Sequence, residues 1–235
     1  MENNMIKNLL VILFIGVVLT ASLKIFGQNH EKENIGNTPI EFLISDFISH
    51  TSKEVTIVGA PKIIDSPYGK AVLFDGVDDG IFLDYTPLLH LSNFTVEVIM
   101  RPDIDGLKEQ RFLHLGELNG ERIMLETRLT ENGFWYVDGF VSSGDEKLIL
   151  IDPSKLHPLT EWYNVAMVNN NGSVEVLING KTELKGELTF LPFKKGKSSI
   201  GVRQNKVFWY KGAIYKIRIT PVALKPEDLL SIENK

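Results

Sequence analysis

The segment over residues 162–181 constrains the fold more than any other part of this 235-residue chain. Two stretches of alternating apolar and polar residues flank an Asn-Gly pair at Asn171 and Gly172, and a second pair follows at Asn179 and Gly180. Asn and Gly adopt the positive φ angles that tight hairpins need. The apolar residues that a period of two assigns to one buried face are Val174, Val176 and Ile178. The segment therefore predicts a β-meander.

Short strand-like runs continue through the body from about residue 38, separated by Gly, Asn, Asp or Pro. Residues 40–47 are apolar and fit either a strand or a short helix. A short helix is expected near the C-terminus, because Pro226 suits a first helical turn and the acidic Glu227 and Asp228 are favoured there. We predict an all-β fold of two packed antiparallel sheets with this short C-terminal helix.

The N-terminus is predicted to be a signal peptide over residues 1–27. Lys7 precedes an apolar stretch over residues 9–23, which suits a secretory signal and is short for a membrane span of about 20 residues. Cleavage would leave a polar tether over residues 28–37 and a domain over residues 38–235, with no membrane span; an uncleaved signal anchor is the alternative. The chain has no Cys, so it is not a lipoprotein. We expect a secreted, periplasmic or cell-surface protein.

Composition narrows the class of ligand. The formal net charge of −5 argues against a nucleic-acid partner, because nucleic-acid binders usually carry a basic face. A body of roughly 200 residues can bury a core without disulfides. Neutral or cationic ligands fit this charge, and a local Arg or Lys could still hold an anionic one.

Five motifs in order resemble the laminin-G-like family of the concanavalin A-like lectin and glucanase superfamily, whose members are jelly-roll sandwiches. The resemblance therefore implies a jelly roll over most of the body. The motifs lie in residues 69–79 (GKAVLFDGVDD), 94–102 (FTVEVIMRP), 162–166 (WYNVA), 176–180 (VLING) and 212–219 (GAIYKIRI).

The departures from the family pattern concern its metal site and its aromatic residues. Tyr215 and Lys216 stand where the family usually has Asp-Glu, so one carboxylate that the resemblance assigns to a structural calcium site is missing. Gly80 and Ile99 stand where the family often has Tyr and Trp, which removes two aromatics from the sheets.

Asp75, Asp78 and Asp79 are the candidate metal ligands. Calcium takes six to eight oxygen ligands, and three carboxylates within five residues could supply several of them. The alternative is a polar turn in which the Asp side chains accept hydrogen bonds from their own backbone. Lys216 argues against the metal. No other cofactor is expected.

Two runs of adjacent aromatics, residues 134–136 and 208–210, supply the candidate ligand-binding residues. Neighbouring strand residues face opposite sides, so each run should bury part of its aromatics and expose part. An exposed ring can stack on a sugar, and a nearby Arg can bond a hydroxyl or a carboxylate. The alternative is that all of these rings are core or edge packing. The candidates are Trp135, Trp209, Tyr210 and Arg203.

The sequence offers no established catalytic pattern. A retaining jelly-roll glycosidase needs two carboxylates about 5 Å apart, and the acidic run that supplies them on one strand is absent. Glu97 stands alone on its strand, and His114 is a single His on an apolar strand. We therefore expect a secreted, non-catalytic module that binds carbohydrate. A protein-interaction subunit of a cell-envelope assembly is the alternative, followed by a glycan-active enzyme.

Overall fold

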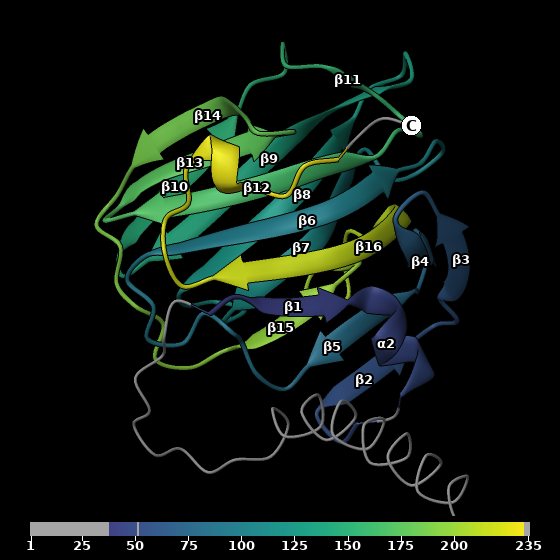
Figure 1. Ribbon diagram of the computed structural model, residues 1–235, viewed down its shortest axis with the longest axis horizontal. Helices are drawn as coiled ribbons and strands as arrows, with labels where there is room; N and C mark the ends of the chain where they lie inside the picture. Colours follow the sequence, from purple (N-terminus) through teal and green to yellow (C-terminus); the bar gives the residue numbers. More distant parts are fainter. Residues whose placement is uncertain (1–37, 51, 233–235) are drawn as a thin grey trace, which may run out of the picture. The chain divides into compact units, whose positions relative to one another are not determined.

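The structure is a computed structural model that describes residues 38–50 and 52–232 (Figure 1). The predicted signal peptide over residues 1–27 and the predicted tether over residues 28–37 lie outside the described residues. Within those described ranges, no helix is long and apolar enough to cross a membrane.

Across the described residues, the strands form two antiparallel sheets of eight strands each. The centre of sheet A is β16 (Lys211–Thr220). It pairs with β6 (Phe94–Pro102) on one side and with β4 (Gly69–Asp75) and β1 (Ile40–Leu43) on the other. The remaining strands of sheet A are β12 (Tyr163–Asn170), β13 (Ser173–Ile178) and β14 (Lys181–Glu187), which follow β6 in that order, and β3 (Lys62–Ser66), which pairs with β4.

Seven strands of sheet B are hydrogen-bonded one to the next in a single path, and the eighth, β11 (His157–Pro158), pairs with the start of β9 (Phe134–Ser143). In spatial order the seven strands are β10 (Glu146–Ile151), β9, β8 (Arg122–Leu129), β7 (Glu109–Gly116), β15 (Lys197–Ile200), β5 (Gly80–Leu83) and β2 (Val55–Val58).

The predicted all-β class and two-sheet architecture are confirmed. Residues 40–47 form neither element alone, because β1 passes directly into the short helix α2 (Ile44–Ser49). The predicted C-terminal helix is a single 3-10 turn, η2 (Pro226–Asp228).

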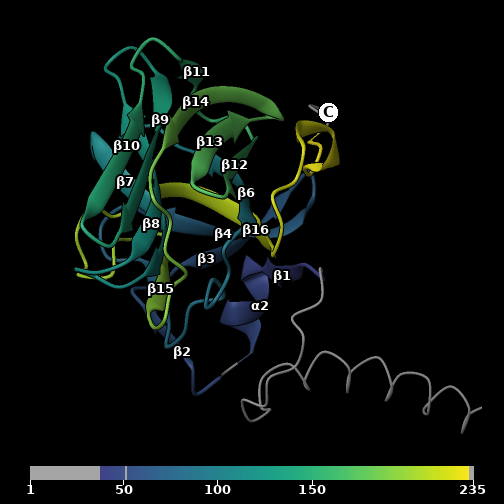
Figure 2. The same cartoon turned by 90° about the vertical axis from the view of Figure 1, so that its left-hand side faces the viewer.

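The core lies between the two sheets, which Figure 2 shows from the side. Alternation on β13 sends Val174, Val176 and Ile178 into this core, as the sequence predicts. Asn171 and Asn179 have φ angles of 51° and 50°, and the glycine after each also has a positive φ, so both predicted hairpin turns are confirmed.

The chain after β16 covers the outer face of sheet A (Figure 2). Leu229 packs there on Ala166 and Leu177 of β12 and β13. Glu97 of β6 is fully buried beneath this tail and accepts a hydrogen bond from the backbone N–H of Leu230 at 2.6 Å. The lone carboxylate of β6 thus anchors the C-terminal tail.

Candidate functional site

Trp135 does not present a ring to solvent, so its predicted exposure is wrong. It is 0% exposed, and its indole packs between His157 and Tyr163 with ring centroids 5.4 Å and 5.2 Å away. Its neighbours Phe134 and Tyr136 point outward, because side chains alternate along β9. The first aromatic run therefore buries the residue that sequence reasoning chose.

Tyr210 is also fully buried, and its predicted exposure is likewise wrong. Its ring lies between Phe74 and Phe112, with centroids 6.3 Å and 5.9 Å away. Burial raises the pKa of the Tyr210 hydroxyl well above its ordinary value. Tyr210 belongs to the core where the chain enters β16.

Trp209 remains half-exposed, and the sequence departure at Gly80 explains its position. A Cβ atom on Gly80 would lie 3.3 Å from Cζ3 of Trp209 and 2.7 Å from Cγ1 of Val202. The absence of a side chain at position 80 therefore leaves room for the indole. Phe82 is half-exposed beside it, with Nζ of Lys206 5.7 Å from the centre of its ring. We call Trp209, Phe82 and Lys206 the aromatic platform.

The loop over residues 201–210 carries this platform and is tied to sheet B. The N–H of Gly201 donates to the carbonyl of Phe112 at 3.0 Å, and the N–H of Arg111 donates to the carbonyl of Phe208 at 2.9 Å. The side-chain amide of Gln204 donates to two backbone carbonyls of the sheet, at 3.0 and 2.9 Å. Figure 2 shows this loop on the side of sheet B away from sheet A.

Phe208 holds the loop in a costly backbone conformation. Its φ is 61°, a left-handed value that costs a residue with a Cβ about 1–2 kcal/mol. In return its ring covers Arg111, whose guanidinium carbon lies 3.7 Å from the ring centre. Strained backbone of this kind is frequent at binding sites.

Arg203 lies on the same loop and is half-exposed. Its Nη1 donates to the side-chain oxygen of Asn205 at 3.3 Å. Its charge acts on His114 and Arg122, which face outward from β7 and β8. Arg203 therefore lies near two buried polar side chains of the sheet.

One row of cross-strand partners on the outer face of sheet B runs from Phe82, beside Trp209, to His114 and beyond. Successive partners in the row are Phe82, Ser199, His114, Met124 and Phe140. Neighbouring strands are about 4.8 Å apart, so Phe82 and His114 are separated by about 10 Å. Both ends of one small oligomeric ligand could therefore be contacted at once.

A closed charge network occupies the opposite end of the same face. Arg128 of β8 pairs with Asp138 of β9 through Nε at 2.9 Å, with Glu109 at 2.6 Å and with Glu126 at 3.2 Å. Arg111 also pairs with Glu126, at 3.0 Å. Sequence reasoning missed this network, although Arg122, Glu126 and Arg128 lie at alternate positions of one strand.

The two buried carboxylates of the network do not form a free catalytic pair. Burial raises the pKa of Glu126 to about 7, with Asp138 adding to the shift and Arg111 and Arg128 opposing it. A raised pKa suits a general acid, but ion-pair networks perturb pKa values as well. Both Glu126 and Asp138 are buried and bound to arginines, which favours the structural role.

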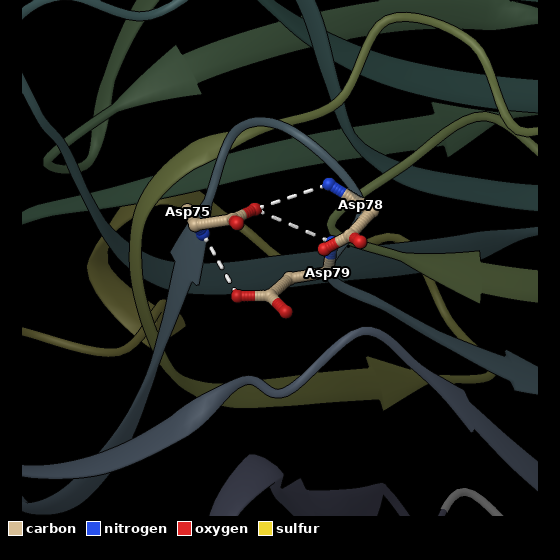
Figure 3. Close-up of side chains that lie close together, drawn as sticks. All are labelled: Asp75, Asp78 and Asp79. Atoms are coloured by element: carbon tan, nitrogen blue, oxygen red, sulfur yellow. Dashed lines mark hydrogen bonds between the residues drawn. The ribbon is translucent and has the colours of Figure 1, made fainter.

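The Asp75 turn uses its carboxylates on backbone groups (Figure 3). Oδ1 of Asp75 accepts from the N–H groups of Val77, Asp78 and Asp79 at 2.8, 3.2 and 3.3 Å. The two oxygens of Asp79 accept from the N–H groups of Ala60 at 2.6 Å and Asp75 at 3.0 Å. The turn that the sequence offered as the alternative to a metal site is therefore present.

The three carboxylates are nevertheless close enough to share an ion, since one ligand atom from each lies within 4.8 Å of the others. Burial raises the pKa of Asp75, but backbone hydrogen bonds outweigh it and hold the pKa below its ordinary value. Burial raises the pKa of Asp79, and the charges of Asp75 and Asp78 add to this. Since three of the carboxylate oxygens already accept backbone hydrogen bonds, the residues fit a self-contained turn better than a calcium cage.

Lys216 does not lie beside this turn in the sheet, contrary to the sequence reasoning. The strand partner of Asp75 is Lys211, and a Cβ on Gly76 would lie 2.7 Å from Cβ of Lys211. Lys216 pairs instead with Glu41 of β1 at 2.9 Å. The Lys216 argument against calcium is therefore replaced by the hydrogen-bonding one.

Sequence reasoning also missed an aromatic trio on sheet A. Tyr68 lies 5.8 Å from Trp162 and 5.9 Å from Tyr215, between ring centroids, and all three rings are half-exposed. Tyr215 joins the trio because a β-bulge on β16 adds it as an extra residue.

The sequence model of one protein family, the concanavalin A-like lectin/glucanases superfamily, matches residues 75–230. The chain belongs to this family. No curated protein is similar in sequence.

Solved structures share the fold. Domain 4 of the extracellular arabinanase AbnA from Geobacillus stearothermophilus, in complex with arabinotriose, has a TM-score of 0.57 at 22% identity, covering 74% of this chain and 84% of that one. A pentraxin from Limulus polyphemus has a TM-score of 0.53 at 16% identity, covering 66% and 77%. The CBM40 of a Ruminococcus gnavus sialidase, bound to sialyllactose, has a TM-score of 0.50 at 15% identity, covering 68% and 94%. Carbohydrate-binding domains are thus among the structural neighbours.

Proposed function

We propose that this protein is a secreted, non-catalytic module that binds glycans through the aromatic platform and Arg203. The observation that carries the proposal is the position of Trp209. Its half-exposed indole lies over Gly80, beside Phe82, on a loop that backbone hydrogen bonds fix to sheet B. Such a preformed surface loses little conformational entropy when a ligand binds.

The two rings would contact the apolar faces of sugar rings, and the charged side chains would bond their polar groups. Lys206, close to the ring of Phe82, and Arg203 place hydrogen-bond donors on the same loop as Trp209. A site with few polar groups around an apolar surface gives modest affinity for one sugar unit. Avidity across repeated units of a polysaccharide would raise the overall affinity.

The family and the structural neighbours support this class of function. The AbnA domain was solved with arabinotriose and the CBM40 with sialyllactose, which makes a glycan the first ligand class to test. Their sequence identities are low, so the choice of residues rests on this chain alone.

The experiment is a glycan-array and polysaccharide-gel screen of the protein and two matched variants. Trp209→Ala removes the platform, whereas Trp162→Ala removes another half-exposed indole, on sheet A. We expect glycan binding that Trp209→Ala abolishes and Trp162→Ala preserves. Binding lost only in Trp162→Ala would overturn the placement and assign the site to the aromatic trio. No binding by the folded protein would overturn the glycan proposal.

A protein partner is the second candidate function, and the edge of sheet B favours it. Ile149 and Ile151 of the edge strand β10 are 61% and 42% exposed. Exposed apolar edge strands are frequent sites of strand pairing with other chains. An envelope partner captured by the protein, and lost with Ile149→Asp, would support this candidate over the glycan one.

Calcium stays a prediction for the Asp75 turn. Asp75 and Asp78 are both exposed, but the backbone hydrogen bonds of the turn go to the carboxylates of Asp75 and Asp79, so Asp78→Asn removes a ligand with least disturbance. A rise in melting temperature with calcium over chelator, absent in Asp78→Asn, would support the ion. Equal melting temperatures would support the turn alone.

A further inference from the structure

Arg122 is a buried cation without a counter-ion. It faces outward from β8, is 9% exposed, and its guanidinium carbon lies 4.8 Å from the ring centre of Phe140. Nη1 donates to the carbonyl of Gly120 at 2.8 Å. Its Nε is buried and has no hydrogen-bond partner, and no carboxylate among the described residues forms an ion pair with it. Buried arginines are almost always paired.

A second buried polar atom without a partner lies next to Arg122. His114 is 0% exposed, and its Nε2 lies 3.2 Å from the carbonyl of Glu117, so Nε2 carries the hydrogen. Nδ1 is then an acceptor, and it has no partner. Burial lowers the pKa of His114 to about 4, and the charges of Arg122 and Arg203 act in the same direction, so the ring is neutral at physiological pH.

Arg203 is the half-exposed member of this group of positive charges. Its repulsion, after burial, lowers the pKa of Arg122. Two guanidinium groups that repel each other, one of them buried without a carboxylate partner, form an environment that an anion would complete. Within the described residues, no acidic side chain fills this position.

We propose that Arg122 and Arg203 form a subsite for the carboxylate of an acidic sugar. The planar carboxylate would bond the guanidinium groups of the two arginines at the surface, whereas His114, which is 0% exposed, would lie beneath them without contacting the sugar. This inference rests on the proposed function and sharpens its ligand class. The row from Phe82 to His114 spans about 10 Å, so one oligosaccharide could stack on Trp209 and place an acidic unit at Arg122.

The test compares oligogalacturonate with its methyl ester, which removes the charge and keeps the sugar. A sulfated dextran tests whether any anion suffices. Binding to the full-length protein is measured by calorimetry, with Arg122→Met and with Arg101→Met as the control. Arg101 also lies over an aromatic ring, 5.6 Å from the centre of Trp162, but on sheet A. Thermal unfolding of each variant shows that it is folded.

We expect the wild type to prefer oligogalacturonate to its methyl ester by at least tenfold, and Arg122→Met alone to abolish this preference. Trp209→Ala should weaken both ligands equally. An acid preference that survives Arg122→Met would overturn the subsite and leave the glycan proposal standing, as would equal binding of both ligands by the wild type. Stronger binding of sulfated dextran would overturn the carboxylate assignment.

A measurement that needs no polysaccharide separates the failure of the subsite from the failure of the proposed function. Galacturonate monomer should raise the melting temperature of the wild type and of Arg101→Met but not of Arg122→Met. This shift would support the subsite even if no polymer binds. Its absence, together with no polymer binding, would overturn both proposals.

Discussion

Arg122 and Arg128 lie on the same strand and the same outward face of sheet B, yet their surroundings are opposite. Arg128 contacts Glu109, Glu126 and Asp138, so its charge is neutralised within the sheet. Arg122 has a phenyl ring, one carbonyl and a second arginine near it. Arg122 is the more buried of the two, yet it is the one that lacks carboxylate partners.

This difference distinguishes a charge that stabilises the sheet from a charge that a ligand can bind. A buried ion network whose members satisfy one another holds three strands together and offers little to a ligand. A buried cation left without an anion costs stability, and an external anion recovers that cost upon binding. The charge of an arginine alone therefore does not distinguish the two roles; its partners do.

The largest expected effect on stability comes from removing the arginine at the centre of the charge network. Arg128→Ala leaves Glu126 and Asp138 buried without their shared cation, which should lower the free energy of unfolding by about 3 kcal/mol at pH 8. Denaturant unfolding measures this loss. A loss below about 1 kcal/mol would mean that the network is not a structural unit, and the comparison would fail.

Glu126→Gln tests the same charge network through the pH dependence of stability. The pKa of Glu126 rises from an ordinary 4.5 to about 7 in the folded state, so between these values the folded protein holds a proton that the unfolded chain releases. Wild-type stability should therefore fall as pH rises through this window, by up to about 1.4 kcal/mol per pH unit from this group. The variant should lack that contribution. A constant difference between the two proteins from pH 4.5 to 7 would contradict the raised pKa.

Arg122→Met should change stability much less than Arg128→Ala. It replaces an unpaired buried cation by an apolar side chain of similar length, so we expect a change within about 1 kcal/mol in either direction. Denaturant unfolding under the conditions used for Arg128→Ala gives the direct comparison. A loss near 3 kcal/mol would show that Arg122 has a structural partner.

The smallest expected effect comes from giving Arg122 an internal carboxylate. Ser142 of β9 is its direct cross-strand partner, and opposite charges in such pairs contribute about 0.5 kcal/mol. Ser142→Asp should therefore be slightly more stable than the wild type and should lose the preference for acidic sugars. Ser142→Asn, which adds no charge, should keep that preference. A stabilised Ser142→Asp that still prefers acidic sugars would place the anion elsewhere.

The fold was largely predictable, because turn chemistry and alternation are local. The Asn-Gly pairs at residues 171–172 and 179–180 and the inward valines of β13 follow from short stretches of sequence. Strand β3 is harder to predict, because its residues are largely exposed and two of its five are charged.

The candidate site was less predictable, because it depends on which strands become neighbours. Alternation says that one residue of an aromatic run is buried, but only the pairing of β9 shows that it is Trp135. The path of residues 201–210 over Gly80, and the partners of Arg122 and Arg128, come from cross-strand register that a single sequence does not specify.

The central position of β16 in sheet A has a consequence for how the domain folds. Among the described strands it is the last along the chain, yet it bonds β6, β4 and β1, which are among the early ones. Sheet A cannot close until residues 211–220 have emerged from the ribosome, because its middle is missing before then. Long-range pairing of this kind folds slowly. The early strands of sheet A therefore keep unpaired edges until β16 is available to join them.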